Sequence, residues 1–306
     1  MAGVAARERA ERVGALPLEY TGQAHGFFTG TMKSVAEIWR HRELLGLLVR
    51  RELKARYKDS SLGVLWSLVR PLAQLLIYYF AIGQVLGVAR SIPSFAIFVF
   101  VGLTAWTLFS EIVAGGTTSI VDNAGLVKKV YLPREIFPLA SLGGALFNFL
   151  MQLIILVLAM IVLGQFPLTL GVLYAPLGLM VIIVFATASA LMLGALNVYF
   201  RDIQHLVEVV LIVLFWTSPI VYSYSYVNQF LQGSWLEQVY LANPITVGIL
   251  GMQRGLWVAG SADPSITNWP PDLAVRLWVA LAVGAVFLWF SQRVFSRLQG
   301  NFAQEL

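Results

Sequence analysis

Residues 118–135 read TSIVDNAGLVKKVYLPRE and separate two apolar runs, each long enough to cross a lipid bilayer. This polar stretch is longer than a connection between two membrane helices needs, and Pro133 stands near its end. Within it, four apolar side chains recur at helical spacing opposite two basic ones. The apolar four are Leu126, Val127, Val130 and Tyr131, and the basic two are Lys128 and Lys129. The spacing predicts a short helix whose apolar stripe a soluble partner would cover, and a solvated loop is the competing interpretation.

The composition is that of an integral membrane protein. Of the 306 residues, 58% are hydrophobic and 12% are charged, whereas a soluble domain has about 25% charged residues. The chain has no cysteine, which excludes disulfides, iron–sulfur clusters and thiolate zinc sites, and with three histidines we expect no metal site. It also lacks a GxxxxGK[ST] phosphate-binding loop, so we expect no ATP hydrolysis by this chain.

Six apolar runs are long enough to span a hydrocarbon core of about 30 Å. They are residues 62–87, 95–117, 137–163, 173–200, 206–222 and 273–290. Eleven of the 21 Lys and Arg residues precede the first run, and only Arg90, Arg254 and Arg276 fall in segments predicted to face outward. Because cytosolic segments carry the excess of basic residues, both termini are predicted to be cytosolic. The sequence therefore predicts an all-α, polytopic membrane protein with six transmembrane helices.

The segments before the first run are polar. Residues 1–30 lack the apolar core of a secretion signal, and we interpret them as a mobile cytosolic tail. Residues 31–59 form a basic amphipathic region in which Trp39 accompanies Arg40 and Arg42. This pattern predicts an interfacial helix in the headgroup layer of an anionic leaflet, with an ordinary soluble helix as the alternative. Residues 60–306 would then form the membrane domain.

The outward-facing segment 225–272 does not read as a simple loop. Asn243 and Pro244 introduce the apolar run 245–256, which is too short to span a bilayer but suits a re-entrant or interfacial helix. We therefore expect two short helices that dip into the outer leaflet before the last transmembrane helix. An ordered extracellular loop packed on the surface is the alternative.

Arg70 and Glu111 are charges predicted to lie inside spans, at nearly matching depths. Mutual pairing, snorkelling of Arg70 to the inner headgroups, and contact between Arg70 and an anionic substrate all remain open. Aromatic residues crowd the first and fifth runs, where membrane packing is the default and a ring-lined passage for sugars the alternative. The candidate lining residues are Arg70, Tyr78, Tyr79, Phe80, Phe215, Trp216 and Tyr222.

Five motifs occur in order along the chain. They are RRELKARYKDSSLGVLWSLVRPL at 50–72, NAGLVKKVYLPRE at 123–135, NVYFRDIQHLVEVVL with SPIVY between 197 and 222, ANPITVGILGMQRGLW at 242–257, and GNFAQEL at 300–306. Together they resemble the membrane permease subunits of ABC-2 type exporters that carry polysaccharide and polyol phosphate. Teichoic acid, O-antigen, capsule and galactan exporters belong to this branch.

The resemblance implies a homodimer in the bacterial plasma membrane, bound to two copies of a separate ATPase that holds the ATP and Mg. The implied activity is export of a lipid-diphosphate-linked polysaccharide to the outer face, with membrane lipids as further partners and no nucleic acid. The loop 118–135 would contain the coupling helix that docks on the ATPase, and segment 225–272 would form an extracellular gate. The implied coupling residues are Asn123, Leu126, Val127, Lys128, Lys129, Val130, Tyr131, Pro133 and Arg134, and Arg201 and Asp202 form a second cytosolic contact.

Two other classes compete with this interpretation. A secondary transporter would usually show more buried ionisable residues and internal repeats with broken helices. A membrane enzyme acting on lipid-linked sugars needs clustered acids or a metal, yet the outer segment offers only Glu237, Asp263 and Asp272. We therefore expect a permease subunit rather than an enzyme. These motifs leave the identity of the polysaccharide open.

Overall fold

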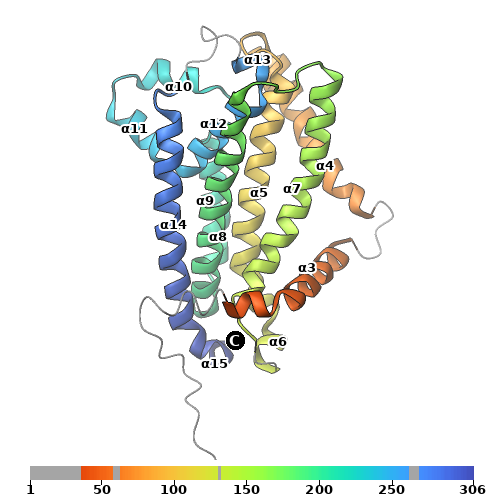
Figure 1. The fold of residues 1–306 in the computed structure, drawn as a ribbon, viewed down its shortest axis with the longest axis vertical. Helices are drawn as coiled ribbons and strands as arrows, with labels where there is room; N and C mark the ends of the chain where they lie inside the picture. The colour runs from red at the N-terminus through yellow and green to blue at the C-terminus, as the bar shows by residue number, and fades with distance from the viewer. Residues whose placement is uncertain (1–35, 58–62, 130–131, 262–268) are drawn as a thin grey trace, which may run out of the picture.

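The computed structural model describes residues 36–57, 63–129, 132–261 and 269–306, and within these ranges every regular element is a helix. Figure 1 shows four long helices standing side by side, with short helices across both ends of the bundle. The four are α5 (Phe95–Asp122), α7 (Ile136–Val162), α8 (Tyr174–Tyr199) and α14 (Leu273–Leu298). The predicted tail at 1–30 lies outside the described residues.

Five helices in the described part of the chain are long and apolar enough to cross a membrane. They cover Leu68–Val85, Phe95–Asp122, Ile136–Val162, Leu170–Tyr199 and Leu273–Glu305. The prediction of an all-α, multi-pass membrane protein is therefore confirmed. The predicted span 206–222 corresponds to α9 (Ile203–Trp216), a shorter apolar helix of 14 residues. It ends early because Pro219 follows, and the residue before a proline is disfavoured in the helical conformation.

The first crossing is not a uniform α-helix. A turn of 3-10 helix, η1 (Gly63–Leu65), leads into α4 (Trp66–Tyr78), which contains Pro71. The helix then continues as the π-helix η2 (Tyr79–Val85) and stops at Gly87, whose φ of 75° is the left-handed conformation that favours glycine. A last turn, η3 (Val88–Arg90), completes the outer end.

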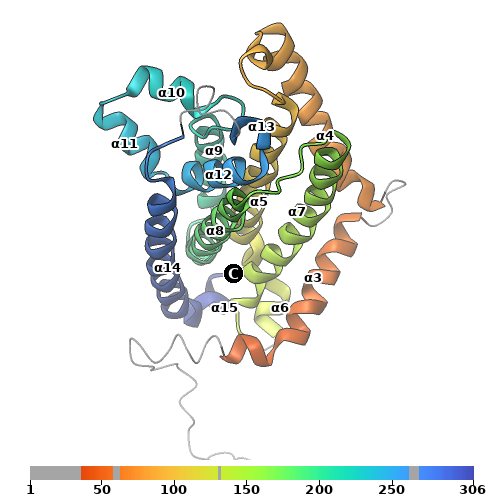
Figure 2. The same ribbon diagram turned by 45° about the horizontal axis from the view of Figure 1, so that its top comes forward.

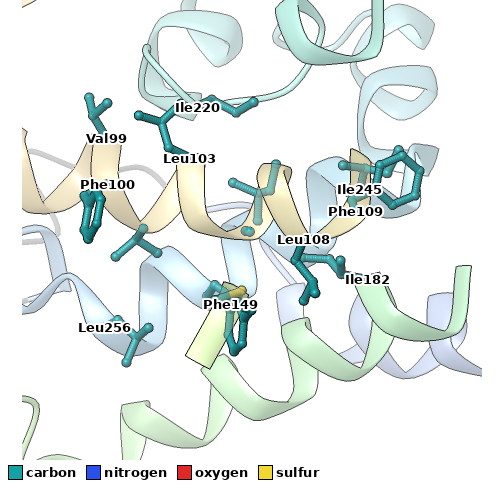
Figure 3. Packing of buried hydrophobic residues seen from close by; sticks show 14 of the residues in the cluster. Val99, Phe100, Leu103, Leu108, Phe109, Phe149, Ile182, Ile220, Ile245 and Leu256 are labelled. Carbon is teal, nitrogen blue, oxygen red and sulfur yellow. The ribbon is translucent and has the colours of Figure 1, made fainter. Parts of the chain in front are cut away.

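The core is built around α5, which lies between α7, α8, α9 and α12. Figure 3 shows Leu103 of α5 pointing toward Ile220 and Leu108 pointing toward Ile182 of α8, and all four side chains are buried. Because its side chains are buried almost all round, α5 is the central helix of this subunit, whereas the outer faces of α4, α7, α9 and α14 remain exposed and apolar.

Glycines allow α8 to approach α12 closely. A methyl group on Gly178 would lie 2.4 Å from the carbonyl oxygen of Gly248 and 2.9 Å from the backbone nitrogen of Met252. The atoms that the methyl group would meet belong to the backbone of α12, so no side chain could move aside to make room for it. The pair α8–α12 is therefore held at a fixed separation.

Four short helices of the described residues lie at the end of the bundle that the sequence predicts to face outward (Figure 2). They are α10 (Tyr224–Leu231), α11 (Trp235–Ala242), α12 (Pro244–Leu256) and α13 (Val258–Ser261). Side-chain oxygens of Ser223, Ser234 and Asn243 cap the first three, and Pro244 occupies the first turn of α12. The predicted helix over 245–256 is thus present. The turn η4 (Leu170–Leu173) precedes α8 at the same end.

The opposite end carries α3 (Arg42–Tyr57), α6 (Ala124–Lys129), η5 (Gln299–Asn301) and α15 (Phe302–Glu305). A short helical segment at 36–40 precedes α3. Figure 2 shows α3 lying obliquely across the base of α7, with α6 and α15 beside it. The sequence predicts this end to be cytosolic.

Candidate functional site

The predicted short helix is present as α6, which follows α5 after the single residue Asn123. The Asn123 amide donates a hydrogen bond to the Ser119 carbonyl at 2.7 Å, and its side-chain oxygen accepts one from the Arg51 guanidinium of α3. The junction between α5 and α6 is therefore fixed from two sides. The hydrogen bond from Arg51 also connects α3 to the start of α6.

The apolar side of α6 faces the rest of the chain. Val127 is only 6% exposed, and with Leu126 it packs in a cluster that includes Leu48 of α3, Phe137 of α7 and Phe302 of α15. Val127 is therefore covered by this chain rather than by a soluble partner, whereas Leu126 is only partly buried. Val130 and Tyr131 lie outside the described residues.

The surface of α6 that remains available is basic. Lys128 and Lys129 are both exposed and end the helix. Cations are stabilised at a helix C-terminus by the aligned peptide dipoles. A partner that docks on α6 would therefore meet two positive charges first, and acidic groups are the complementary chemistry.

The residues after α6 return to the bundle through a buried junction. Pro133 is partly buried, and the Arg134 guanidinium carbon lies 5.6 Å from the centre of the Phe302 ring. Glu135 is only 3% exposed and immediately precedes α7. Burial raises the pKa of the Glu135 carboxyl, and the negative charge of Glu37 raises it further. A hydrogen bond from the Gln299 side chain and the nearby Arg134 act in the opposite direction.

Replacing Glu135 by glutamine should stabilise the folded protein at alkaline pH. A carboxyl whose pKa is raised by folding binds its proton more tightly in the folded state, so native stability falls as pH rises above the ordinary value of 4.5. The amide keeps a hydrogen-bonding group at this position but never ionises. We expect the unfolding midpoint of Glu135→Gln to exceed that of the native protein by about 2–4 °C at pH 8 and by less at pH 5.

Thermal unfolding of the detergent-solubilised protein at the two pH values checks this prediction. Glu305→Gln, an exposed change in the neighbouring helix α15, is the matched control and should leave the midpoint unchanged at both. Equal shifts of the Glu135→Gln midpoint at pH 5 and pH 8 would contradict a raised pKa of the Glu135 carboxyl in the folded protein.

Helix α3 has a buried side and an exposed side. Leu48 is buried, whereas Leu47 is mostly exposed. A methyl group on Gly143 of α7 would lie 2.5 Å from a Val49 methyl carbon, so this glycine forms the notch into which α3 packs. The Arg42 guanidinium carbon lies 5.5 Å from the ring of the exposed Trp39. Arg40 is also exposed, so aromatic and basic side chains lie together at the surface just before and at the start of α3.

The second predicted cytosolic contact is an exposed turn. Arg201 and Asp202 lie between α8 and α9, and both are exposed. A hydrogen bond closes the turn: the Asn197 side-chain oxygen, near the end of α8, accepts it from the Gln204 backbone nitrogen of α9 at 3.2 Å. His205 and Glu208 lie 3.9 Å apart on the first turns of α9.

The structure brings three of the predicted aromatic residues together with one that was missed. The Phe215 ring of α9 lies 6.0 Å from Tyr78 of α4, 5.3 Å from Trp216 and 5.5 Å from Trp106 of α5. We call Tyr78, Trp106, Phe215 and Trp216 the aromatic cluster. Trp106 escapes notice in the sequence because α5 is apolar throughout, so no periodicity marks the face on which it lies.

The remaining aromatic candidates flank this cluster. Tyr79 and Phe80 pack edge to face at 5.7 Å at the start of η2, and Phe80 is mostly exposed. The Tyr222 hydroxyl donates a hydrogen bond to the Trp216 carbonyl at 3.0 Å, which fixes the chain after α9. Trp216 is 56% exposed, so the aromatic cluster reaches the surface of the subunit between α4 and α9.

Arg70 and Glu111 have different surroundings. Arg70 is exposed on α4, whereas the Glu111 carboxylate accepts a hydrogen bond from the Asn148 amide of α7 at 2.6 Å. Glu111 thus contacts α7, and mutual pairing with Arg70 stays a prediction. Snorkelling and contact with an anionic substrate stay open.

Comparison with known proteins identifies the family. Residues 43–257 match the family model described as ABC-2 type transporter. The chain is 32% identical to the O-antigen export system permease protein RfbA of Myxococcus xanthus over 275 residues, which cover 90% of this chain and all of that protein. It is 30% identical to a permease protein of the same name from Klebsiella pneumoniae over 221 residues, covering 72% of this chain and 82% of that protein. The resemblance to permeases of polysaccharide exporters is therefore confirmed, and the chain belongs to the ABC-2 type transporter family.

Proposed function

We propose that this chain is the transmembrane subunit of an exporter that moves a lipid-linked cell-envelope polysaccharide of the O-antigen type from the cytosolic to the outer face of the bacterial plasma membrane. A separate ATPase supplies the energy. The observation that carries the proposal is the similarity along the whole length of an O-antigen export permease. The packing of α6 supports it, because an exposed basic helix anchored to the membrane bundle is suited to receive a partner.

In this proposal the chain crosses the membrane six times. Helix α9 has 14 residues and spans about 21 Å, which is short of the hydrocarbon core of about 30 Å. Residues 217–222 continue the crossing as irregular backbone, where they pack on α5 and line the interior rather than face lipid. An even number of crossings puts both termini on the same side, and the distribution of basic residues makes the cytosolic side the expected one.

The proposed assembly contains two copies of this chain and two ATPase subunits, which carry the ATP and Mg. Lys128 and Lys129 would contact acidic groups of the ATPase, and the exposed turn at Arg201 and Asp202 would make the second contact. Exposed apolar side chains follow α4 and α9, among them Leu72, Leu76, Val209, Ile212 and Trp216. We propose that these faces lie toward the second subunit and enclose the passage, and that the aromatic cluster lies along it.

Replacing Trp216 by alanine should reduce export more than it reduces ATP hydrolysis. Each aromatic ring contact contributes about 1 kcal/mol, so losing one between ring and sugar corresponds to about a fivefold lower export rate. ATP hydrolysis, which takes place on the partner, should stay within about twofold of its native rate. The measurement is polymer export and ATP hydrolysis by the same reconstituted complex.

Trp278→Ala is the matched control for this prediction. Trp278 is a tryptophan of similar exposure, 61% against 56%, but it lies on α14, away from the aromatic cluster. We expect both activities of the control to remain near native. An equal loss of export and ATP hydrolysis in Trp216→Ala would mean that the ring only stabilises the fold.

The experiment that tests the proposed function is export into proteoliposomes. The chain would be reconstituted with the ABC ATPase that co-purifies with it, and a lipid-linked O-antigen would be supplied on the side where ATP is added. The proposal expects ATP-dependent appearance of the polymer on the opposite face, insensitive to ionophores. Transport that an ion gradient drives without ATP would indicate a secondary transporter instead. Hydrolysis or transfer of the lipid-linked sugar by the chain alone would indicate an enzyme. Teichoic acid and galactan precursors supplied in parallel would identify the polymer.

A further inference from the structure

The last residues of the chain form a compact segment beneath the bundle, which we call the C-terminal clip and define as residues 298–306. It contains the turn η5 and the helix α15, whose four residues are too few for a helix to be stable alone. Nevertheless Phe302 is 0% exposed. Contacts with the rest of the chain therefore hold the clip in place.

One set of contacts joins the clip to both ends of the coupling stretch. Phe302 belongs to the same buried cluster as Val127 of α6. Its ring lies 5.6 Å from the Arg134 guanidinium carbon, at the point where the chain returns toward α7. The Gln299 side chain lies near the buried Glu135 carboxyl and partly offsets the rise that burial causes in its pKa. The clip therefore contacts the coupling stretch 118–135 on both sides of residues 130 and 131, which lie outside the described residues.

A second set of contacts joins the clip to the transmembrane helices. The Tyr199 hydroxyl, at the end of α8, donates a hydrogen bond to the Leu298 carbonyl at 2.8 Å. The Phe302 ring packs edge to face against Tyr199 at 6.1 Å and against Phe295 of α14 at 5.5 Å. One buried ring thus contacts α8, α14 and the return of the coupling stretch together.

We propose that the C-terminal clip is the mechanical link between the coupling helix and the transmembrane helices α8 and α14, with Phe302 as its central positioning residue. This inference rests on the proposed function in one respect, because it takes α6 as the place where the ATPase acts. Helix α6 has only six residues, and besides the clip it is held by Asn123 and by the packing of Val127 with α3 and α7. The clip adds the connection to α8 and α14, since movement of α6 must displace a ring packed between these two helices.

The test compares Phe302→Ala with Gln304→Ala in the complex of the full chain with its ATPase. Gln304 lies in the same four-residue helix but is exposed, so it controls for changes to the C-terminus as such. The first readout is amide hydrogen exchange. We expect exchange over residues 124–129 to be about tenfold faster in Phe302→Ala, with α5 unchanged and Gln304→Ala native throughout. Unchanged exchange over 124–129, or an equal increase in every helix, would overturn the proposal.

The second readout is the amount of polymer exported for each ATP hydrolysed. We expect this ratio to fall about tenfold in Phe302→Ala while the ATPase remains bound, because the link rather than the docking surface is lost. Export and hydrolysis falling by one common factor would indicate a merely structural role and overturn the proposal. If Phe302→Ala fails to insert, Phe302→Leu keeps most of the apolar volume and should show the same two effects at about threefold.

Failure of the clip and failure of the proposed function give different results. If the ATPase does not act through α6, charge changes at Lys128 and Lys129 leave assembly intact. Hydrogen exchange over 124–129 in Phe302→Ala still reports whether the clip holds α6.

Discussion

Replacing Lys128 and Lys129 together by glutamate should detach the ATPase and reduce polysaccharide export by at least about tenfold, because like charges placed across an interface cost several kcal/mol. These two cations form the exposed surface of α6, whereas its apolar side is already covered by α3, α7 and α15. Since neither lysine is buried, the variant should fold and insert normally. Co-purification of the ATPase with the tagged permease and ATP-driven export, measured side by side, check the prediction.

A double change on α3 provides the control for altered net charge. Arg50→Glu with Lys54→Glu removes the same number of positive charges from exposed positions on a different helix at the same end of the bundle. It should leave the ATPase bound. Normal assembly and export in the Lys128→Glu, Lys129→Glu variant would exclude α6 as the docking element. The sequence also predicts that Val130→Asp with Tyr131→Asp uncouples the complex, although both positions lie outside the described residues.

Replacing Gly178 by leucine should prevent most of the protein from folding. Even a methyl group at this position would lie 2.4 Å from the Gly248 carbonyl oxygen, so α8 and α12 would have to separate along their contact. Overpacking usually lowers the free energy of unfolding by about 1–3 kcal/mol. The loss is larger where the obstacle is backbone, because backbone cannot move aside as a side chain can. We expect the yield of monodisperse protein in detergent to fall by at least about tenfold, as a loss of more than 1.4 kcal/mol would produce.

Gly46→Leu is the matched control for this packing prediction. It introduces the same side chain into a helix, but nothing lies within 4 Å of a methyl group at Gly46. Its yield should equal that of the native protein. A normal yield of Gly178→Leu would show that α8 and α12 do not pack as closely as described.

Most of the transmembrane architecture follows from hydropathy alone. The runs at 95–117, 137–163 and 173–200 became α5, α7 and α8 because long apolar segments with at most one charge have few other stable structures in a bilayer. The run at 206–222 was less well predicted. Hydropathy continues through Pro219, but the helix ends at Trp216, since hydropathy does not register the loss of helical geometry before a proline.

The site was harder to predict, because long-range packing determines which face of α6 is free. The spacing of Leu126 and Val127 marks an apolar side correctly, but it cannot tell whether a partner or the same chain covers that side. Leu48 and Phe302, which cover it here, lie far away in the sequence. Depth was equally uninformative for Arg70 and Glu111, because residues at one level of a bilayer can point in opposite directions. Nothing in the sequence indicated that an asparagine on α7 would contact Glu111.

The π-helix η2 at the outer half of the first crossing has a consequence for Tyr79 and Phe80, which stand at its start. A π-helix closes its hydrogen bonds one residue later than an α-helix does, so conversion to α-helix shifts the register by one residue. One residue corresponds to a rotation of about 100° and a rise of about 1.5 Å. The part of the helix on one side of η2 can therefore turn relative to the other while every backbone amide finds a new partner within the same helix. Such a change of register would redirect the two rings from one surface of the crossing to the next without unwinding it.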